Sequence, residues 1–312
     1  MRLALNPLVC LLLLLTPFAA HGQTPQPPDF TKTVINENGL VGELYRPTTP
    51  GRHPAVLVVG GSEGGIKGSA PIARRLAQQG YTALAIAYFD LPGLPDKMEL
   101  LPLEYFDKAL DRLEADPSVD RRKVAVMGAS KGGEAALIIG SRRKDVRAVI
   151  AGVPSNVMWQ GFSFKAQVDT STWSVGGKPT AFVPYDTSKP FISVLDFYQR
   201  SRAFEGRYPD AAIPVERIRG PVLLVAGEAD QMWPSADMAR AVAARLKARN
   251  FRYPVTLLTY ADAGHAAFGP PAPANTPGLS FMFKLGGTEA GNLAARQQSW
   301  DATLALLAKT LK

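Results

Sequence analysis

A serine in a glycine-rich turn is the first feature of this sequence that could do chemistry. Residues 124–127 are apolar and are followed by G-A-S-K-G-G-E, in which Ser130 has glycines two residues to either side, and an apolar segment at 135–139 comes next. The pattern predicts a strand, a sharp turn and a helix, the arrangement that presents a serine hydroxyl as a nucleophile. The alternative is an ordinary glycine-rich turn, because Gly and Ser are common residues.

A serine hydroxyl needs a base that takes its proton, and the chain has three histidines. His21 lies in a segment that we expect to be removed. His53 precedes Pro54, which favours an extended surface turn. His265 lies in a loop after the apolar segment 255–260, downstream of the serine. We therefore predict His265 as the base.

A third residue should orient the imidazole and stabilise its charged form. This acid is expected between Ser130 and His265 in the sequence, directly after a strand. The turn G-E-A-D follows the apolar segment 221–226, and we predict Asp230 as the acid. The less favoured candidates are Asp262, which is the main rival and belongs to the loop of the histidine, Glu228 in the same turn as Asp230, and Asp237 on the following helix.

Acyl transfer through a serine creates a negatively charged oxygen that needs backbone N–H donors. One donor is expected from the residue after the nucleophile, Lys131. A second is expected from the loop G-G-S-E-G-G at 60–65, which follows the apolar segment 55–59, and Gly61 and Ser62 are the candidates. The rival interpretation is a phosphate-binding loop, but neither G-x-x-x-x-G-K-[ST] nor G-x-G-x-x-G is present.

The elements that must position these residues alternate along most of the chain. The pair Asn38-Gly39 predicts a tight hairpin turn at the start of the domain. Buried strands are then predicted at 55–59, 82–88, 124–127, 146–150, 221–226 and 255–260, and helices at 71–79, 103–115, 236–248 and 290–311. This alternation predicts an α/β fold with a doubly wound, mostly parallel sheet, as in the α/β-hydrolases.

Residues 154–214 interrupt the alternation with many aromatic residues, Gly, Ser and Pro. An insertion of this kind is expected to cover the active site as a cap and to line an apolar pocket. The alternative is a satellite core that touches no substrate. The aromatic residues that we expect to line the substrate pocket are Trp159, Phe162, Trp173 and Trp233.

The first residues have the pattern of a secretory signal peptide: Arg2, an apolar run, and small residues before a cleavage site that we place before Gln23. The expected organisation is a signal peptide at 1–22, a flexible proline-rich leader at 23–33 and a hydrolase domain at 34–312. The alternative is an uncleaved anchor. Cleavage would remove Cys10, the single cysteine, so disulfides and a Cys/His zinc site are not expected. The mature protein would be periplasmic or secreted, without a stable membrane span.

Composition indicates a globular enzyme, with 46% hydrophobic and 20% charged residues. The net charge of +8 would become +7 after processing. Short basic clusters flank the ends of predicted helices and strands, which is typical of solvated surface, and no basic motif interleaved with aromatic residues indicates nucleic-acid binding.

Several stretches resemble one known family. They are G-A-S-K-G-G-E, W-Q-G-F-S-F, S-T-W-S-V-G-G-K-P, the run that contains D-Q-M-W-P-S, and A-G-H. They are similar to the C-terminal catalytic domain of acyl-CoA thioesterases and bile acid-CoA:amino acid N-acyltransferases, which are relatives of dienelactone hydrolase. The resemblance runs from about residue 34 to the C-terminus and implies Ser130, Asp230 and His265 as the catalytic residues.

Two departures from that family bear on function. The family's mammalian enzymes carry an N-terminal β-sandwich domain, whereas here a short leader and hairpin precede the hydrolase. The amino-acid-transferring members use cysteine as the nucleophile, so the serine here favours water as the acceptor. The expected function is hydrolysis of a hydrophobic acyl thioester or ester, most nearly that of an acyl-CoA thioesterase, without a metal or organic cofactor.

Two alternatives remain open. Export argues against CoA esters, which are mainly intracellular, and favours a carboxylesterase or lactonase like dienelactone hydrolase. A non-catalytic lipid- or metabolite-binding homologue is the alternative outside the enzyme class. It predicts that a fluorophosphonate would not label Ser130.

Overall fold

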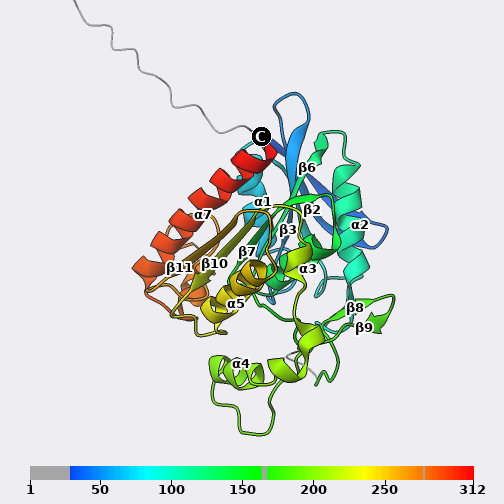
Figure 1. The fold of residues 1–312 in the computed structure, drawn as a ribbon. Helices are drawn as coiled ribbons and strands as arrows, with labels where there is room; N and C mark the ends of the chain where they lie inside the picture. Colours follow the sequence, from blue (N-terminus) through cyan, green and yellow to red (C-terminus); the bar gives the residue numbers. More distant parts are fainter. Residues whose placement is uncertain (1–28, 164–166, 277) are drawn as a thin grey trace, which may run out of the picture.

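The computed structural model describes residues 29–163, 167–276 and 278–312. The predicted signal peptide, 1–22, and residues 23–28 of the predicted leader lie outside the described residues. The described residues form one main sheet between helices, with a further segment that extends from one end of it (Figure 1). Among them, no helix is both long and apolar enough to cross a membrane.

The main sheet has eight strands in the order β1-β2-β4-β3-β6-β7-β10-β11. β2 pairs antiparallel with β1 and with β4, and all later pairs are parallel. All side chains of β4 and β10 are buried, as expected for strands covered on both faces. The predicted α/β fold with a mostly parallel sheet is confirmed. The strands are β1 (Phe30–Glu37), β2 (Leu40–Pro47), β3 (His53–Val59), β4 (Thr82–Ala87), β6 (Val119–Ala129), β7 (Val146–Gly152), β10 (Val222–Gly227) and β11 (Val255–Tyr260).

Helices cover both faces of this sheet (Figure 1). Apolar residues of α2, α3 and α5 share a buried core with one face, and those of α1 and α7 share a second core with the other. This division produces the doubly wound arrangement that the alternating pattern predicts. The helices are α1 (Ser69–Ala77), α2 (Leu103–Glu114), α3 (Lys131–Arg142), α4 (Val194–Arg202), α5 (Ser235–Ala248), α6 (Leu279–Phe283) and α7 (Glu289–Leu311).

The predicted hairpin joins β1 and β2. Asn38 and Gly39 have φ angles of 52° and 77°, which a tight two-residue turn requires. β1 begins at Phe30, earlier than the start at residue 34 that the sequence pattern indicates. Phe30 pairs with Pro47 and its ring packs edge-on against Tyr45, with 5.6 Å between centroids. Strand pairing and this ring contact therefore include residues 30–33, which the sequence assigned to the leader, in the sheet.

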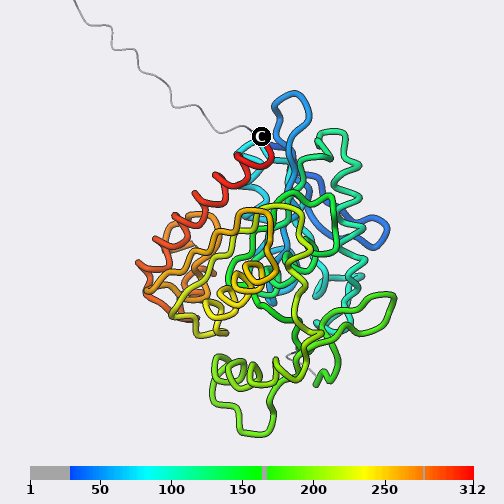
Figure 2. Tube along the Cα trace, in the orientation of Figure 1, coloured from blue at the N-terminus to red at the C-terminus, as the bar shows by residue number. Residues whose placement is uncertain are grey.

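The insertion between β7 and β10 starts at the carboxyl end of β7. It contains β8 (Trp173–Val175), β9 (Lys178–Pro179), α4 and three short 3₁₀ helices, η1 (Glu205–Arg207), η2 (Pro209–Ala211) and η3 (Val215–Arg217). β8 also pairs with β5 (Leu101–Pro102), which precedes α2, so a small sheet β5-β8-β9 attaches the insertion to the main body. Figure 2 shows that most of the inserted chain gathers at one end of the molecule.

Candidate active site

Ser130 lies in the turn between β6 and α3, at the carboxyl edge of the parallel strands. Its φ of 57° and ψ of −124° belong to a region that side chains other than glycine rarely adopt. The turn is held because the Ser130 N–H donates to the Gly152 carbonyl at 2.9 Å, and the Ser130 carbonyl accepts from the N–H groups of Gly133 and Glu134 at 2.8 and 3.1 Å. The surrounding backbone therefore stabilises a strained conformation that projects the hydroxyl from the sheet.

Glycines beside Ser130 allow β6, α3 and β3 to approach closely. A Cβ added at Gly128 would lie 2.2 Å from the carbonyl oxygen of Gly132, and one added at Gly132 would lie 2.3 Å from that of Val59. Both distances are far below a van der Waals contact, so a larger residue at either position would displace backbone.

The three residues predicted as nucleophile, base and acid come into contact. Ser130 Oγ lies 2.9 Å from His265 Nε2, and His265 Nδ1 lies 2.8 Å from Asp230 Oδ2. His265 and Asp230 are each 4% exposed, whereas Ser130 is half-buried. The arrangement can take a proton from a serine that a substrate can reach and pass it to a base shielded from water.

Four donors fix the Asp230 carboxylate. Oδ2 accepts from His265 and from the Ser235 hydroxyl, which lies 2.6 Å away, and Oδ1 accepts from the N–H groups of Met232 and Trp233 at 2.8 and 3.3 Å. Together these hydrogen bonds hold the carboxylate in one orientation towards the imidazole. Ser235 opens α5 five residues after Asp230, and no sequence pattern marked it as a partner of the acid.

The rival acids lie elsewhere. The side chain of Asp262 is exposed, and its main-chain carbonyl accepts the N–H of Thr288 at 2.8 Å. Glu228 and Asp237 both pair with Arg240. The structure thus brings Asp230, rather than these three residues, to the imidazole of His265.

The loop that carries His265 is fastened by α7. The buried Asn292 side chain accepts the Gly264 N–H at 2.9 Å and donates to the carbonyls of Gly286 and Thr288 at 3.0 and 2.9 Å. Its amide thus joins the residue before His265 to the start of α7. No sequence pattern marks Asn292, because the Gly264 N–H that it accepts lies 28 residues away in the chain.

His53 differs from the expectation of a surface turn. It begins β3 and is 9% exposed, and its Nε2 lies 2.9 Å from the Thr49 carbonyl oxygen. The strand starts one residue before Pro54, so the extended conformation that proline favours became part of the sheet rather than of a turn.

Two backbone segments flank the Ser130 hydroxyl. Lys131 opens α3, where the first N–H groups have no partner within the helix. A Cβ added at Gly61 would lie 3.2 Å from Ser130 Cβ, so the 60–65 loop passes directly beside the nucleophile. The Gly61 N–H donates to the Glu63 carboxylate at 3.0 Å, and Ser62 is half-buried next to it.

Tyr88 supports this loop from inside the protein. Its hydroxyl donates to the carbonyls of Gly60 and Gly61, at 3.0 and 3.2 Å. Complete burial, together with the nearby carboxylates of Glu63 and Glu134, raises the pKa of Tyr88 well above its ordinary value. Tyr88 therefore stays a hydrogen-bond donor, and the loop keeps its conformation.

The four predicted pocket residues occupy different places. The Trp233 ring lies 5.9 Å from the His265 ring, and its indole N–H donates to the Val153 carbonyl at 3.1 Å. Trp159 and Trp173 are completely buried, and Phe162 is half-buried against the main core. Trp233 thus adjoins His265 although it is only 2% exposed, and Trp159 and Trp173 have no surface open to a ligand in this conformation.

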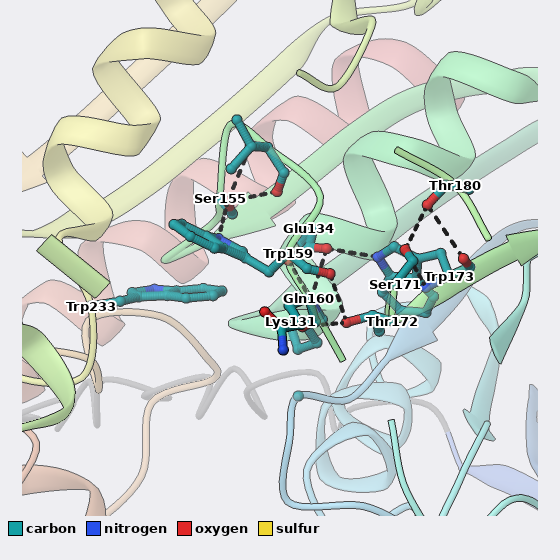
Figure 3. A network of polar contacts seen from close by, with 12 residues as sticks. Lys131, Glu134, Ser155, Trp159, Gln160, Ser171, Thr172, Trp173, Thr180 and Trp233 are labelled. Carbon is teal, nitrogen blue, oxygen red and sulfur yellow. Dashed lines mark hydrogen bonds and ion pairs between the residues drawn. The ribbon is translucent and has the colours of Figure 1, made fainter. Parts of the chain in front are cut away.

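A buried ion pair next to Ser130 has no counterpart in the sequence-based predictions. The Lys131 ammonium lies 2.9 and 2.8 Å from the two carboxylate oxygens of Glu134, and the Trp173 indole N–H donates to Glu134 at 2.6 Å (Figure 3). Burial raises the pKa of Glu134 and lowers that of Lys131, and each partner opposes the shift of the other. The apolar residues at 135–139, directly after Glu134, were the sequence feature that could have indicated burial of α3 here.

Comparison with known proteins relates this geometry to a family. The family described as "BAAT / Acyl-CoA thioester hydrolase C terminal" matches residues 101–312. The chain is 31% identical over 241 residues to human acyl-coenzyme A thioesterase 1, covering 77% of this chain and 55% of the relative. It is 26% identical over 283 residues to mouse bile acid-CoA:amino acid N-acyltransferase, covering 88% and 64%. The chain therefore spans little more than half the length of these relatives.

Solved structures show the same fold. A putative dienelactone hydrolase from Klebsiella pneumoniae has a TM-score of 0.56 at 18% identity, with coverage of 90% of this chain and 98% of that one. An alpha/beta hydrolase from a deep-sea metagenome library also has a TM-score of 0.56 at 18% identity, with coverage of 92% and 99%. The fold is therefore that of the α/β-hydrolases, and the match over residues 101–312 shows that this chain belongs to the BAAT / acyl-CoA thioester hydrolase C-terminal family.

Proposed function

We propose that this chain is a serine hydrolase that cleaves a hydrophobic acyl thioester through an acyl-enzyme. The observation that carries the proposal is the hydrogen-bonded series from Ser130 through His265 to Asp230, with distances of 2.9 and 2.8 Å. The thioester class is supported by the names of the family and of its thioesterase relatives.

In the first half of the reaction, Ser130 Oγ attacks the thioester carbonyl while His265 Nε2 accepts the hydroxyl proton. Asp230 holds the imidazole with Nε2 facing the serine and stabilises the imidazolium. When the tetrahedral intermediate collapses, the carbon–sulfur bond breaks and His265 gives its proton to the departing thiolate. The acyl group is then an ester of Ser130.

The negatively charged oxygen of the intermediate would be bound by the Lys131 N–H and by one N–H of the 60–65 loop. The Gly61 N–H already donates to Glu63. A substrate oxygen would therefore either displace that carboxylate or use the Ser62 N–H. Since Glu63 is exposed, its carboxylate can move into solvent when a substrate binds.

In the second half, water replaces the thiol. His265 takes a proton from the water, the hydroxide attacks the acyl ester, and Ser130 recovers its proton as the free acid leaves. We propose that Trp233 lines the acyl side of the site, because its ring adjoins His265.

The test compares kcat/KM for one acyl chain presented as a CoA thioester and as an oxygen ester. Ser130→Ala should lower turnover of both by more than about 10⁴-fold, and a fluorophosphonate should label wild-type Ser130 but not this variant. Ser141→Ala, at the other end of α3, is the matched control and should retain activity. Labelling that persists in Ser130→Ala and disappears when a different serine is changed would overturn the assignment.

One observation favours a second candidate function. The signal peptide predicted at 1–22 implies export, and CoA esters are mainly intracellular. An exported protein with this site would be a carboxylesterase or lactonase. A higher kcat/KM for the oxygen ester, corrected for the intrinsic reactivity of the two substrates, would support that function. Recovery of a chain that begins at Gln23 from the periplasm or medium would support export.

A further inference from the structure

The buried ion pair at the start of α3 is not explained by helix stability alone. Lys131 and Glu134 are 5% and 0% exposed, and their charged groups face each other. Removing two charges from water is costly, and apolar residues of similar volume often stabilise a fold equally well. A pair retained directly beside the nucleophile therefore suggests a role in the site.

Glu134 contacts two segments in the first part of the insertion. Its carboxylate accepts the indole N–H of Trp173 at 2.6 Å, and the backbone of Trp159 lies close enough to oppose the rise in the pKa of Glu134. These two segments are joined to each other because the Thr172 hydroxyl and the Thr172 N–H both donate to the Trp159 carbonyl, at 3.1 and 3.2 Å. Figure 3 shows the Trp173 indole directed at Glu134 and the bonds that join the two segments. A single carboxylate thus fastens the insertion to the first turn of α3.

Lys131 connects that fastening to the nucleophile. Its backbone N–H directly follows Ser130, whereas its ammonium reaches Glu134 and lies 5.4 Å from the centroid of the Trp173 ring. A displacement of the Lys131 side chain would therefore also move the Lys131 backbone N–H, which would face the oxyanion. The positive φ of Ser130 makes this turn sensitive, because a strained conformation relaxes when its supports are removed.

We propose that Lys131 and Glu134 act as positioning residues, which clamp the insertion onto α3 and thereby hold the Lys131 N–H in place for the oxyanion. This inference rests on the proposed function. Glu134 touches no reacting atom, so its effect passes through Lys131. Loosening the clamp should slow chemistry more than it weakens substrate binding, because an oxyanion donor acts mainly in the transition state.

The test uses the double variant Lys131→Met/Glu134→Gln. It removes the pair without leaving one buried charge unpaired, which a single change would do. Glu216→Gln is the matched control, because Glu216 also forms an ion pair with two hydrogen bonds, to Arg245 at 2.7 and 2.9 Å, away from the site. We would measure Tm, kcat, KM, the rate of fluorophosphonate labelling, and hydrogen exchange of peptides covering 128–136 and 155–161.

We expect the double variant to fold with a Tm close to that of the wild type, and Glu216→Gln to match the wild type in every readout. In the double variant, kcat and the labelling rate should fall about 10- to 100-fold, with KM changed less than about three-fold, and both peptides should exchange faster. The proposal is overturned if kcat and exchange stay at wild-type values, or if kcat falls only in proportion to the loss of folded protein.

The proposed function can fail separately. If wild-type Ser130 is neither labelled nor active, the nucleophile assignment is wrong. The hydrogen-exchange comparison still decides whether the Lys131–Glu134 pair couples the start of α3 to the insertion. Faster exchange in both peptides would then support the clamp. Faster exchange in one peptide alone would overturn it.

Discussion

At the scale of single residues, Asp230 and Asp262 provide the sharpest contrast. Both precede His265 and lie in plausible turns of the sequence, but the Asp230 carboxylate is buried and accepts four hydrogen bonds, whereas the Asp262 side chain is exposed. In Asp230→Asn, the amide N–H₂ would face donors, and the imidazole would lose both its orientation and its counter-charge. We expect kcat to fall by about 10³-fold or more and Tm to decrease, because buried donors lose their acceptor.

Asp262→Asn is the matched control for that change. Its main-chain carbonyl, which accepts the Thr288 N–H, remains, so kcat should stay within about two-fold of the wild type. Steady-state kinetics of the two variants on one substrate decide between the two acids. A large loss in Asp262→Asn together with a small one in Asp230→Asn would contradict the assignment.

Asn292 is the residue on α7 that we expect to matter most for the histidine. Asn292→Ala removes the acceptor for the buried Gly264 N–H, which costs about 1–3 kcal/mol when left unsatisfied. The loop before His265 should then loosen, so that kcat falls about ten-fold and Tm decreases. Gln297→Ala, on an exposed turn of the same helix, pairs only with Asp301 and should change neither value. Equal effects of the two variants would contradict a specific role of Asn292.

At the scale of elements, the end of α2 contains a carboxyl that responds to pH. Burial, together with the charge of Asp145, raises the pKa of Glu114 to about 7, although Arg143 lies close to it. Glu114 is also the last residue of α2, where the helix dipole disfavours a negative charge. Below its unfolded pKa the carboxyl is protonated in both states, and its contribution to stability is lost as the pH rises towards 7.

Glu114→Gln removes this titration. The difference in unfolding free energy between variant and wild type should grow in favour of the variant from about pH 4.5 to 7 and then level off. Chemical denaturation at several pH values would measure it. A difference that is independent of pH, or that shrinks over this interval, would contradict the raised pKa.

At the scale of the whole molecule, a wide groove lies at the end opposite the candidate site. A cavity of roughly 820 Å³ is lined by residues after α3, before β10 and after α5. It lies at the far end of α3, whose 12 residues separate it from Ser130 by about 18 Å. Five of its basic side chains form no ion pair within the described part of the chain: Lys144, Arg217, Arg219, Arg249 and Arg252.

This separation yields a prediction about substrate binding. Arg217→Glu/Arg219→Glu should leave kcat/KM for a CoA thioester within about two-fold of the wild type at physiological salt, because charges are screened over about 8 Å. The measurement is kcat/KM for wild type and variant at physiological and at ten-fold lower ionic strength. A ten-fold increase in KM at physiological salt would show that the groove, despite its place, binds the phosphates of the leaving group.

The sequence predicted the architecture well because strands and helices have local periods. Alternating elements predicted the parallel sheet, and the Asn38-Gly39 pair predicted the hairpin turn, both of which the structure contains. The order of serine, acid and histidine also reduced the catalytic candidates to three residues, Ser130, Asp230 and His265, whose side chains the structure brings into contact. The first two signals depend on residues close together in the chain, and the third depends on a fixed order of residues along it.

The supporting residues could not be predicted in the same way. Glu134 and Trp173 are 39 positions apart, and in sequence Lys131 and Glu134 have the spacing of an ordinary solvated pair on a helix. Aromatic composition likewise did not distinguish Trp233, which adjoins His265, from Trp159 and Trp173, because all three are buried. The position of each side chain in the fold decides these roles, and it depends on contacts between distant segments.

The close approach of β6, α3 and β3 at the turn of Ser130 also bears on how this protein could acquire new chemistry. Backbone atoms of Gly132 and Val59 occupy the room that a side chain at Gly128 or Gly132 would need, so even alanine is excluded at both glycines. Change in this turn is therefore easier at Ser130, the proposed nucleophile, where replacing oxygen by sulfur adds little volume. Larger changes of specificity are easier in those parts of the inserted segment that do not contact Glu134.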